Sequence, residues 1–167
     1  FTEIDYTLDY SFDICEKVSA SVGVIHYDFP NTSFDSTTEL YAGLTGNVFL
    51  SPSLTVYHDI DEAGGTYVLG GIGHTLCEWD MFDGEVGGAL DVGTSVGFGD
   101  SDHNNFYYGV DDAAFTNWDA SVAVPFTWGN FSLTPSLNYS RLLDEDIRDN
   151  SGDDDNVWGA IAVGWSF

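Results

Sequence analysis

The closing segment Val157–Phe167 limits the possible folds more than any other part of the chain. Its large apolar residues share one face of an extended segment and its small residues share the other. The apolar face holds Val157, Ile161, Val163, Trp165 and Phe167, and the small-residue face holds Ala160, Ala162, Gly164 and Ser166. The last residues of a soluble domain are usually solvated, whereas a strand whose outer face meets lipid can end on an apolar aromatic. The pattern is typical of a transmembrane β-barrel.

The chain is strongly acidic, with 28 Asp+Glu against 3 Lys+Arg and a formal net charge of -25. Binding to nucleic acid needs clustered Lys and Arg, so this balance excludes a nucleic-acid partner. With 43% hydrophobic and 16% aromatic residues, the composition is also far from that of a disordered acidic chain. A folded chain of this kind must place its carboxylates where water or cations reach them.

Alternation of apolar and polar residues runs through almost the whole sequence and predicts an all-β fold without helices. It is clearest at 3–14, where Ile4, Tyr6, Leu8, Tyr10, Phe12 and Ile14 alternate with polar residues. The other expected strands are at 17–29, 37–50, 53–61, 66–77, 86–99, 114–127, 130–139 and 156–167. Together they predict nine strands in a single domain, 1–167.

The connections between the expected strands alternate in length. Short turns are expected at Glu16, Ser51-Pro52 and Trp128-Gly129, with a medium one at 78–85, and longer polar connections at 30–36, 62–65, 100–113 and 143–155. This alternation is typical of an antiparallel up-and-down barrel in the bacterial outer membrane. Because single-chain bacterial barrels have an even number of strands, either N-terminal strands are missing or one of the nine is miscounted. We expect a complete barrel of about 10–12 strands.

Several segments resemble the TorF-type outer-membrane porin family. They are Tyr27–Pro30, Thr38–Leu44, Leu50–Tyr57, Gly65–Val68 and Trp165–Phe167, and at the level of pattern the resemblance covers most of the chain. It implies an outer-membrane barrel of about twelve strands. It also implies that Val163, Trp165 and Phe167 form a C-terminal signal read by the outer-membrane assembly machinery. The resemblance carries no catalytic residues.

Acidic residues occupy the strand positions that alternate with the apolar ones. If the apolar positions face lipid, the acidic residues line the interior of the barrel. They are Glu3, Asp5, Asp9, Asp13, Asp59, Asp61, Asp91 and Asp119. With so few basic partners, these carboxylates require water or mobile cations around them. We therefore predict a porin-like channel that passes small solutes and prefers cations. A narrow structural barrel, in which the acids only solvate the interior, remains an alternative.

Two acidic loops are candidate divalent-cation sites. Asp100, Asp102, Asn104, Asn105 and Asp111 follow the ligand spacing of a calcium loop, although the last ligand is Asp instead of the usual Glu. A second group comprises Asp144-Glu145-Asp146, Asp149 and Asp153-Asp154-Asp155. Solvated surface is the simpler interpretation of both loops, and bridging through cations to lipopolysaccharide is another alternative. A soluble calcium-binding β-domain is a further alternative.

The remaining reactive residues do not predict an enzyme or a bound cofactor. His26, His58, His74 and His103 lack a motif that would orient a general base. Cys15 and Cys77 lie on the same expected rim, where they could form one disulfide or remain free thiols. Trp79, Trp128 and Trp165 are expected in an aromatic girdle near the short turns, and Arg141 near lipid phosphate. No residue identifies an oligomer face, although a homo-oligomer is possible.

Overall fold

The computed structural model describes residues 2–152 and 154–167, which form a 10-stranded antiparallel sheet and three short helical segments. In the order of the sheet, the strands from the first edge are β1 (Ile4–Cys15), β2 (Val18–Asp28), β3 (Thr37–Gly46), β4 (Ser53–Asp59), β5 (Thr66–Met81) and β6 (Val86–Gly99). They continue with β7 (Ala114–Ala123), β8 (Phe126–Trp128), β9 (Phe131–Leu142) and β10 (Asp155–Trp165). The predicted all-β fold is confirmed.

The tenth strand arises because the segment expected as one strand at 114–127 is divided in two. β7 and β8 both pair with β6 and with β9, so they occupy one position in the sheet. The break falls at Val124-Pro125, where proline has no N–H to offer to a ladder. The backbone stays connected, since Val124 N–H donates to the Pro135 carbonyl at 3.0 Å and Ala89 N–H to the Pro125 carbonyl at 3.1 Å.

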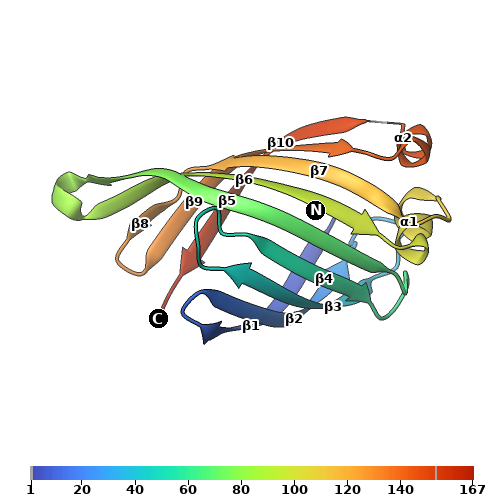
Figure 1. Ribbon diagram of the computed structural model, residues 1–167, viewed down its shortest axis with the longest axis horizontal. Helices are drawn as coiled ribbons and strands as arrows, with labels where there is room; N and C mark the ends of the chain where they lie inside the picture. The colour runs from blue at the N-terminus through green and yellow to red at the C-terminus, as the bar shows by residue number, and fades with distance from the viewer. Residues whose placement is uncertain (1, 153) are drawn as a thin grey trace.

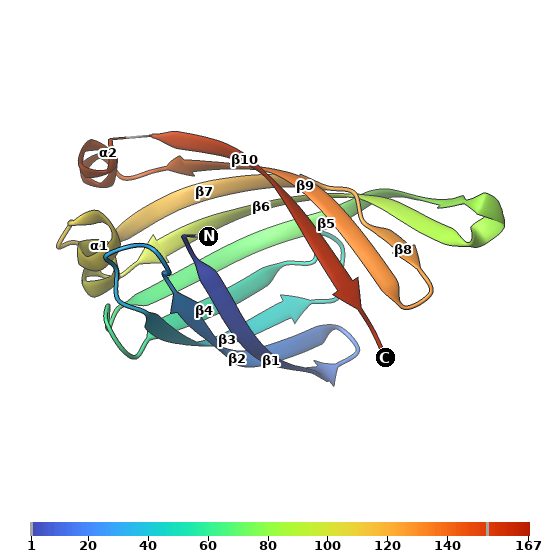
Figure 2. The ribbon, with the colours of Figure 1, turned by 180° about the vertical axis from the view of Figure 1, so that it is seen from behind.

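The sheet is strongly curled, and its two end strands are β1 and β10 (Figures 1 and 2). Each of these strands has one paired neighbour among the described residues, β2 and β9 respectively. Free strand edges leave backbone N–H and C=O groups without sheet partners. The described chain is therefore a curled open sheet with two available edges.

Cross-strand register separates apolar from polar side chains over the whole sheet. On one face, rows such as Leu8, Val24 and Leu40 run from strand to strand. On the other face, Asp9 and Tyr41 flank Gly23, and the Tyr41 hydroxyl reaches over this glycine to donate to the Asp9 carboxylate at 2.5 Å.

The polar face is the concave one. A single cavity is lined both by Glu3, at the start of β1, and by Ser140 and Leu142 of β9, although six strands separate β1 from β9 in the sheet order. Only curling towards the polar side brings these residues together. We call the polar side the concave face and the apolar side the convex face.

The chain has almost no hydrophobic core. Among the described residues, the buried hydrophobic side chains are Ala20, Val110 and Ile147. On the convex face, in contrast, Leu8 and Ile161 are each 73% exposed and Val163 is 64% exposed. The apolar residues therefore lie on the outside of a single layer, where no second layer of the described chain covers them.

Two α-helices lie at one end of the sheet, in the longest connections, and the prediction of a fold without helices was wrong there (Figure 1). α1 (Ser101–Tyr108) is capped by the Asp100 carboxylate, which accepts from His103 N–H at 2.9 Å, and ends at Gly109 with φ of 70°. α2 (Glu145–Ser151) is capped in the same way by Asp144 and ends at Gly152 with φ of 77°. Neither helix is long or apolar enough to cross a membrane.

The two ends of the sheet differ as the sequence predicts. One end carries the connections 29–36, 60–65, 100–113 and 143–154, and we call it the loop rim. The other end, the turn rim, carries 16–17, 47–52, 82–85 and 129–130, including the 3-10 helix η1 (Phe82–Gly84). At the turn rim the β5–β6 hairpin extends beyond the neighbouring strands (Figure 1), because β5 continues to Met81 instead of ending at 77.

We predict that Gly23→Ala destabilises the protein, whereas Gly159→Ala does not. A Cβ at position 23 would lie 2.5 Å from the Leu8 carbonyl oxygen and 2.5 Å from the Tyr41 ring. Crowding of this kind costs about 1–3 kcal/mol in the free energy of unfolding. At position 159 the nearest atom would be the Ser136 carbonyl oxygen at an ordinary 3.7 Å. Urea unfolding of both variants in detergent, followed by circular dichroism, tests this; equal midpoints would contradict it.

Candidate functional site

The acidic residues expected in the interior lie along the concave face. Asp5, Asp9 and Asp13 occupy this phase in β1, Asp59 ends β4, Asp91 lies in β6 and Asp119 in β7. Glu3 precedes β1 and lines the cavity at the loop rim. Asp61 lies outside the strands, in the β4–β5 connection. The aspartates in the strands share one face but do not form one cluster.

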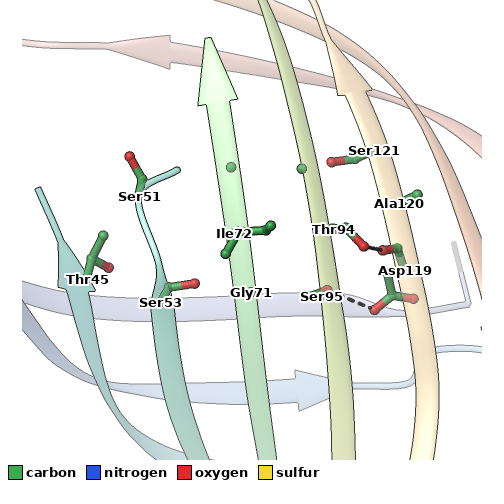
Figure 3. Close-up of a pocket in the computed structure, with 12 residues that line it drawn as sticks. Thr45, Ser51, Ser53, Gly71, Ile72, Thr94, Ser95, Asp119, Ala120 and Ser121 are labelled. Carbon is green, nitrogen blue, oxygen red and sulfur yellow. Dashed lines mark hydrogen bonds between the residues drawn. The ribbon is translucent and has the colours of Figure 1, made fainter. Parts of the chain in front are cut away.

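A row of small side chains crosses the middle of the concave face (Figure 3). Thr45, Ser53, Gly71, Ser95 and Asp119 are successive cross-strand partners from β3 to β7. They border a cavity of about 390 Å³. Because hydroxyl groups and glycine occupy little volume, this part of the concave face leaves room for water.

Asp119 is the charged member of this row, and neutral groups hold it. Its carboxylate accepts from Asn117 Nδ2 at 2.7 Å and from the Ser95 hydroxyl at 3.3 Å. The Asn117 amide oxygen in turn accepts from the Tyr67 hydroxyl at 2.8 Å. The carboxylate is thus oriented without a cationic partner.

All three basic residues lie away from the concave face. Lys17 is in the β1–β2 turn, and Arg148 is in α2, where its guanidinium donates to the Leu143 carbonyl at 2.7 Å. Arg141 is paired in register with Trp118 and Asp155, in the convex phase that the sequence predicted for it. The negative charge of the concave face is therefore uncompensated by the protein itself.

Asp59 and Glu39 are neighbours at the loop rim and are both buried, at 2% and 7% exposure. The Asp59 carboxylate accepts from the Thr37 hydroxyl at 2.5 Å and from the N–H groups of Asp61 and Ala63 at 2.9 and 3.1 Å. Glu39 accepts from the Tyr27 hydroxyl at 2.7 Å. Sequence reasoning singled out Asp59 but missed Glu39, although its phase, shared with Tyr41, places it on the same face.

Sequence reasoning also missed a run of aromatic rings on the concave face. Tyr41, Tyr57 and Tyr67 are direct cross-strand partners, with ring centroids 5.7 and 6.1 Å apart. His103 of α1 stacks on Tyr67 at 5.0 Å, and Tyr107 follows at 4.6 Å from His103. We call these five rings the aromatic row. The aromatic row connects the sheet to α1, which lies in the longest connection, 100–113.

Burial, hydrogen bonds and neighbouring carboxylates shift the pKa values of His103 and Tyr107 in α1 and of the capping residue Asp100. Burial lowers the pKa of His103, an effect that the charges of Asp100 and Asp59 oppose. Burial raises the pKa of Tyr107, and the charge of Glu39 adds to this. Burial disfavours the charged Asp100 carboxyl, but hydrogen bonds from His103 and Thr66 bring its pKa below the ordinary value. At neutral pH the helix therefore carries a neutral imidazole and neutral phenols above an anionic surface.

The segment with calcium-loop spacing is used to build α1. Asp100 is the helix cap, and the buried Asn104 amide donates to the Gly99 and Asp112 carbonyls at 3.1 and 2.8 Å. Asp102 and Asp111 are at the surface. Within residues 2–152 and 154–167 no group of three His, Cys, Asp or Glu side chains is placed to hold a metal ion.

In the second acidic loop, Asp144 caps α2 and Asp153 lies outside the described residues. Calcium binding stays a prediction.

The aromatic residues expected at the turn rim do come together on the convex face. Trp128 and Phe131 lie 4.4 Å apart by ring centroid, and Phe131 and Trp165 lie 6.3 Å apart. The ring centroid of Trp79 lies 6.5 Å from that of Phe126 on the same face.

Of the proposed assembly signal, Val163 and Trp165 lie on the convex face of β10 and Phe167 is fully exposed. Cys15 and Cys77 are exposed free thiols.

Comparison with known protein families and with curated proteins finds no match to this chain. The resemblance to the TorF-type porins therefore stays a prediction, and the arguments for function rest on the geometry of the two faces.

We predict that Thr37→Val destabilises the loop rim and that the same change at the adjacent Thr38 does not. Thr37 is 1% exposed, and its hydroxyl donates to Asp59 and accepts from Glu62 N–H at 3.3 Å. Leaving buried polar groups without a partner costs about 1–3 kcal/mol. Thr38 faces the convex side, where its hydroxyl shares a hydrogen bond of 3.0 Å with the ring of His26. Because this pair is exposed and valine suits a strand, the expected change is within about 0.5 kcal/mol. Thermal melting of both variants measures the difference, and equal melting temperatures would refute it.

Proposed function

We propose that the chain forms the wall of a bacterial outer-membrane β-barrel that conducts small cations. The observation that carries this proposal is the division of one sheet into an exposed apolar convex face and an acidic concave face. A transmembrane barrel has this arrangement, with lipid outside and water inside.

The apolar convex face supports the membrane part of the proposal. Large exposed apolar patches on soluble proteins mark surfaces that something else covers. Here the exposed apolar residues extend from β1, through Leu54 and Leu137, to Ile161 in β10, and so cover the full width of the sheet. A soluble sandwich would need a second sheet over them. The aromatic cluster of Trp128, Phe131 and Trp165 suits a membrane interface.

The acidic concave face supports the cation preference. Asp9, Asp59 and Asp119 are held by hydroxyl and amide donors, which leave their negative charge in place. A pore with fixed carboxylates raises the local concentration of cations and excludes anions. No catalytic chemistry, cofactor or nucleic acid is part of this function. Lipid, lipopolysaccharide and the assembly machinery are its expected partners.

In a membrane, the free edges of β1 and β10 must find partners. Unpaired backbone groups are not tolerated against lipid hydrocarbon, which is why spanning sheets close. Closure can come from direct pairing of β1 with β10 or from added strands. Either arrangement keeps the acidic face inside, because the register fixes the phase of every strand.

A narrow structural barrel is the second candidate, and the position of α1 favours it. His103 and Tyr107 lie over the concave face beside Tyr67, where they reduce the free cross-section at the loop rim. The acidic loops would then serve as the displayed surface.

Conductance of the full-length protein in a planar bilayer under a KCl gradient tests the proposal. We expect stable current steps with a reversal potential that favours K⁺. The triple variant Asp5→Asn, Asp9→Asn, Asp13→Asn should move this potential towards zero, because it removes three charges from the concave face. The control removes three charges from exposed connections, Glu16→Gln, Asp35→Asn and Asp149→Asn, and should leave it nearly unchanged.

The other outcomes are equally informative. Current without ion preference would overturn the cation channel. Inserted protein without current would support the narrow structural barrel. Protein that stays soluble and monomeric without detergent would overturn the membrane location.

A further inference from the structure

A second cavity lies at the loop rim, between the concave face and α1. Its volume is about 480 Å³, within the range of small-molecule sites. Half of the residues that line it are aromatic, among them Tyr27, Tyr57, Tyr67, His103, Tyr107 and Tyr108. They come from β2, β4, β5 and α1, so the cavity exists only because α1 folds back over the sheet.

The rings form a continuous surface. Tyr57 and Tyr67 are 6.1 Å apart by ring centroid, Tyr67 and His103 are stacked at 5.0 Å, and His103 and Tyr107 are 4.6 Å apart. Two further contacts hold α1 in this position. Asn150 of α2 donates to the carbonyls of Tyr108 and Gly109 at 3.3 and 3.2 Å. The aromatic surface is thus built into the fold.

Two carboxylates also line the cavity, and none of the lining residues that the structure describes is Lys or Arg. Glu39 is 7% exposed and is fixed by the Tyr27 hydroxyl at 2.7 Å, and Glu3 lies on the β1 side. Asp59 is the cross-strand partner of Glu39 and adds a third negative charge close by. The raised pKa of the Tyr107 phenol has burial as its first cause and the charges of Glu39, Asp59 and Glu3 as further ones, so these charges act on this space.

We propose that this cavity binds a small organic ammonium ion with apolar substituents, of the quaternary amine type. Aromatic rings with nearby carboxylates are the environment that such ions favour, since the ring faces attract the charge and also accept the apolar groups. This inference does not rest on the proposed channel, because a site in the concave face can bind an amine whether or not the protein conducts.

Two other classes of ligand fit the wall less well. Inorganic cations such as Ca²⁺ prefer six or more oxygen ligands, whereas aromatic and aliphatic residues make up most of this wall. A neutral sugar could stack on the tyrosines but would gain nothing from Glu3, Glu39 and Asp59. Both classes are included in the test.

The test is calorimetric titration of the full-length protein in a nonionic polyoxyethylene detergent. Choline chloride is the probe, and 3,3-dimethylbutan-1-ol is its uncharged counterpart of the same shape. We expect choline to bind about tenfold or more tightly than the alcohol, the ratio that one desolvated cation–π contact supplies. CaCl₂, KCl and glucose at the same concentrations should give no saturable heat. Equal affinity for the alcohol, or binding of glucose instead of choline, would overturn the proposal.

Substitutions distinguish the contribution of the Tyr107 ring to choline binding from that of the Glu39 charge. Tyr107→Leu should weaken choline binding about 3- to 30-fold, whereas Tyr107→Phe, which keeps the ring, should stay within about twofold. Glu39→Gln keeps the shape of the side chain and should also weaken it, so the charge can be tested even if Tyr107→Leu does not fold. Tyr10→Leu on the convex face and Asp149→Asn on α2 are the matched controls and should not change binding.

Different results would overturn the proposed binding site and the proposed channel. Choline binding without any current overturns the channel and leaves the site. Current without choline binding overturns the site and leaves the channel.

Discussion

The structure depends on one constraint: the described chain forms a single sheet with no second layer, so its two faces carry side chains of opposite polarity, apolar on one and polar on the other. Strand geometry sends alternate residues to opposite faces, so the register that pairs Leu8 with Val24 also pairs Asp9 with Gly23. With Ala20, Val110 and Ile147 as its buried hydrophobic residues among those described, the chain cannot rely on a core. Backbone pairing and cross-strand contacts hold it, and the apolar side chains of the convex face are exposed in the described chain.

The same constraint explains how so acidic a concave face can exist. Four of its carboxylates are held by neutral side-chain donors: Asp9 by Tyr41, Asp59 by Thr37, Asp91 by Thr75 at 2.6 Å and Asp119 by Asn117. Neutral donors orient a carboxylate without cancelling its charge, whereas Lys or Arg would cancel it. The three basic residues, Lys17, Arg141 and Arg148, all lie elsewhere. The face is therefore ordered and yet still negative, which a cation path requires.

The sequence predicted the strands well because their signal is local. Period-two alternation located every strand position, and the long–short alternation of connections located both rims. The helices were missed for a physical reason: they are a few residues long, and polar residues such as Asn104 and Asn105 give them weak propensity. Their signals were the caps, Asp100 with Gly109 and Asp144 with Gly152, but the first group was interpreted as a calcium loop. Glu39 and the aromatic row were missed because their meaning depends on which strands lie side by side.

The position of α1 connects the two proposals. The helix is fixed at its first turn by Asp100, along its length by the stack of His103 on Tyr67, and at its end by Asn150. It therefore forms one wall of the cavity at the loop rim. The cavity beside Asp119 and its small neighbours lies elsewhere on the concave face and is lined by different residues. A cation entering from the loop rim would first meet aromatic rings together with Glu3, Glu39 and Asp59, and then Asp119 with room for water around it. Such an order would favour organic ammonium ions at the entrance, because the rings replace part of the hydration that these ions hold only weakly.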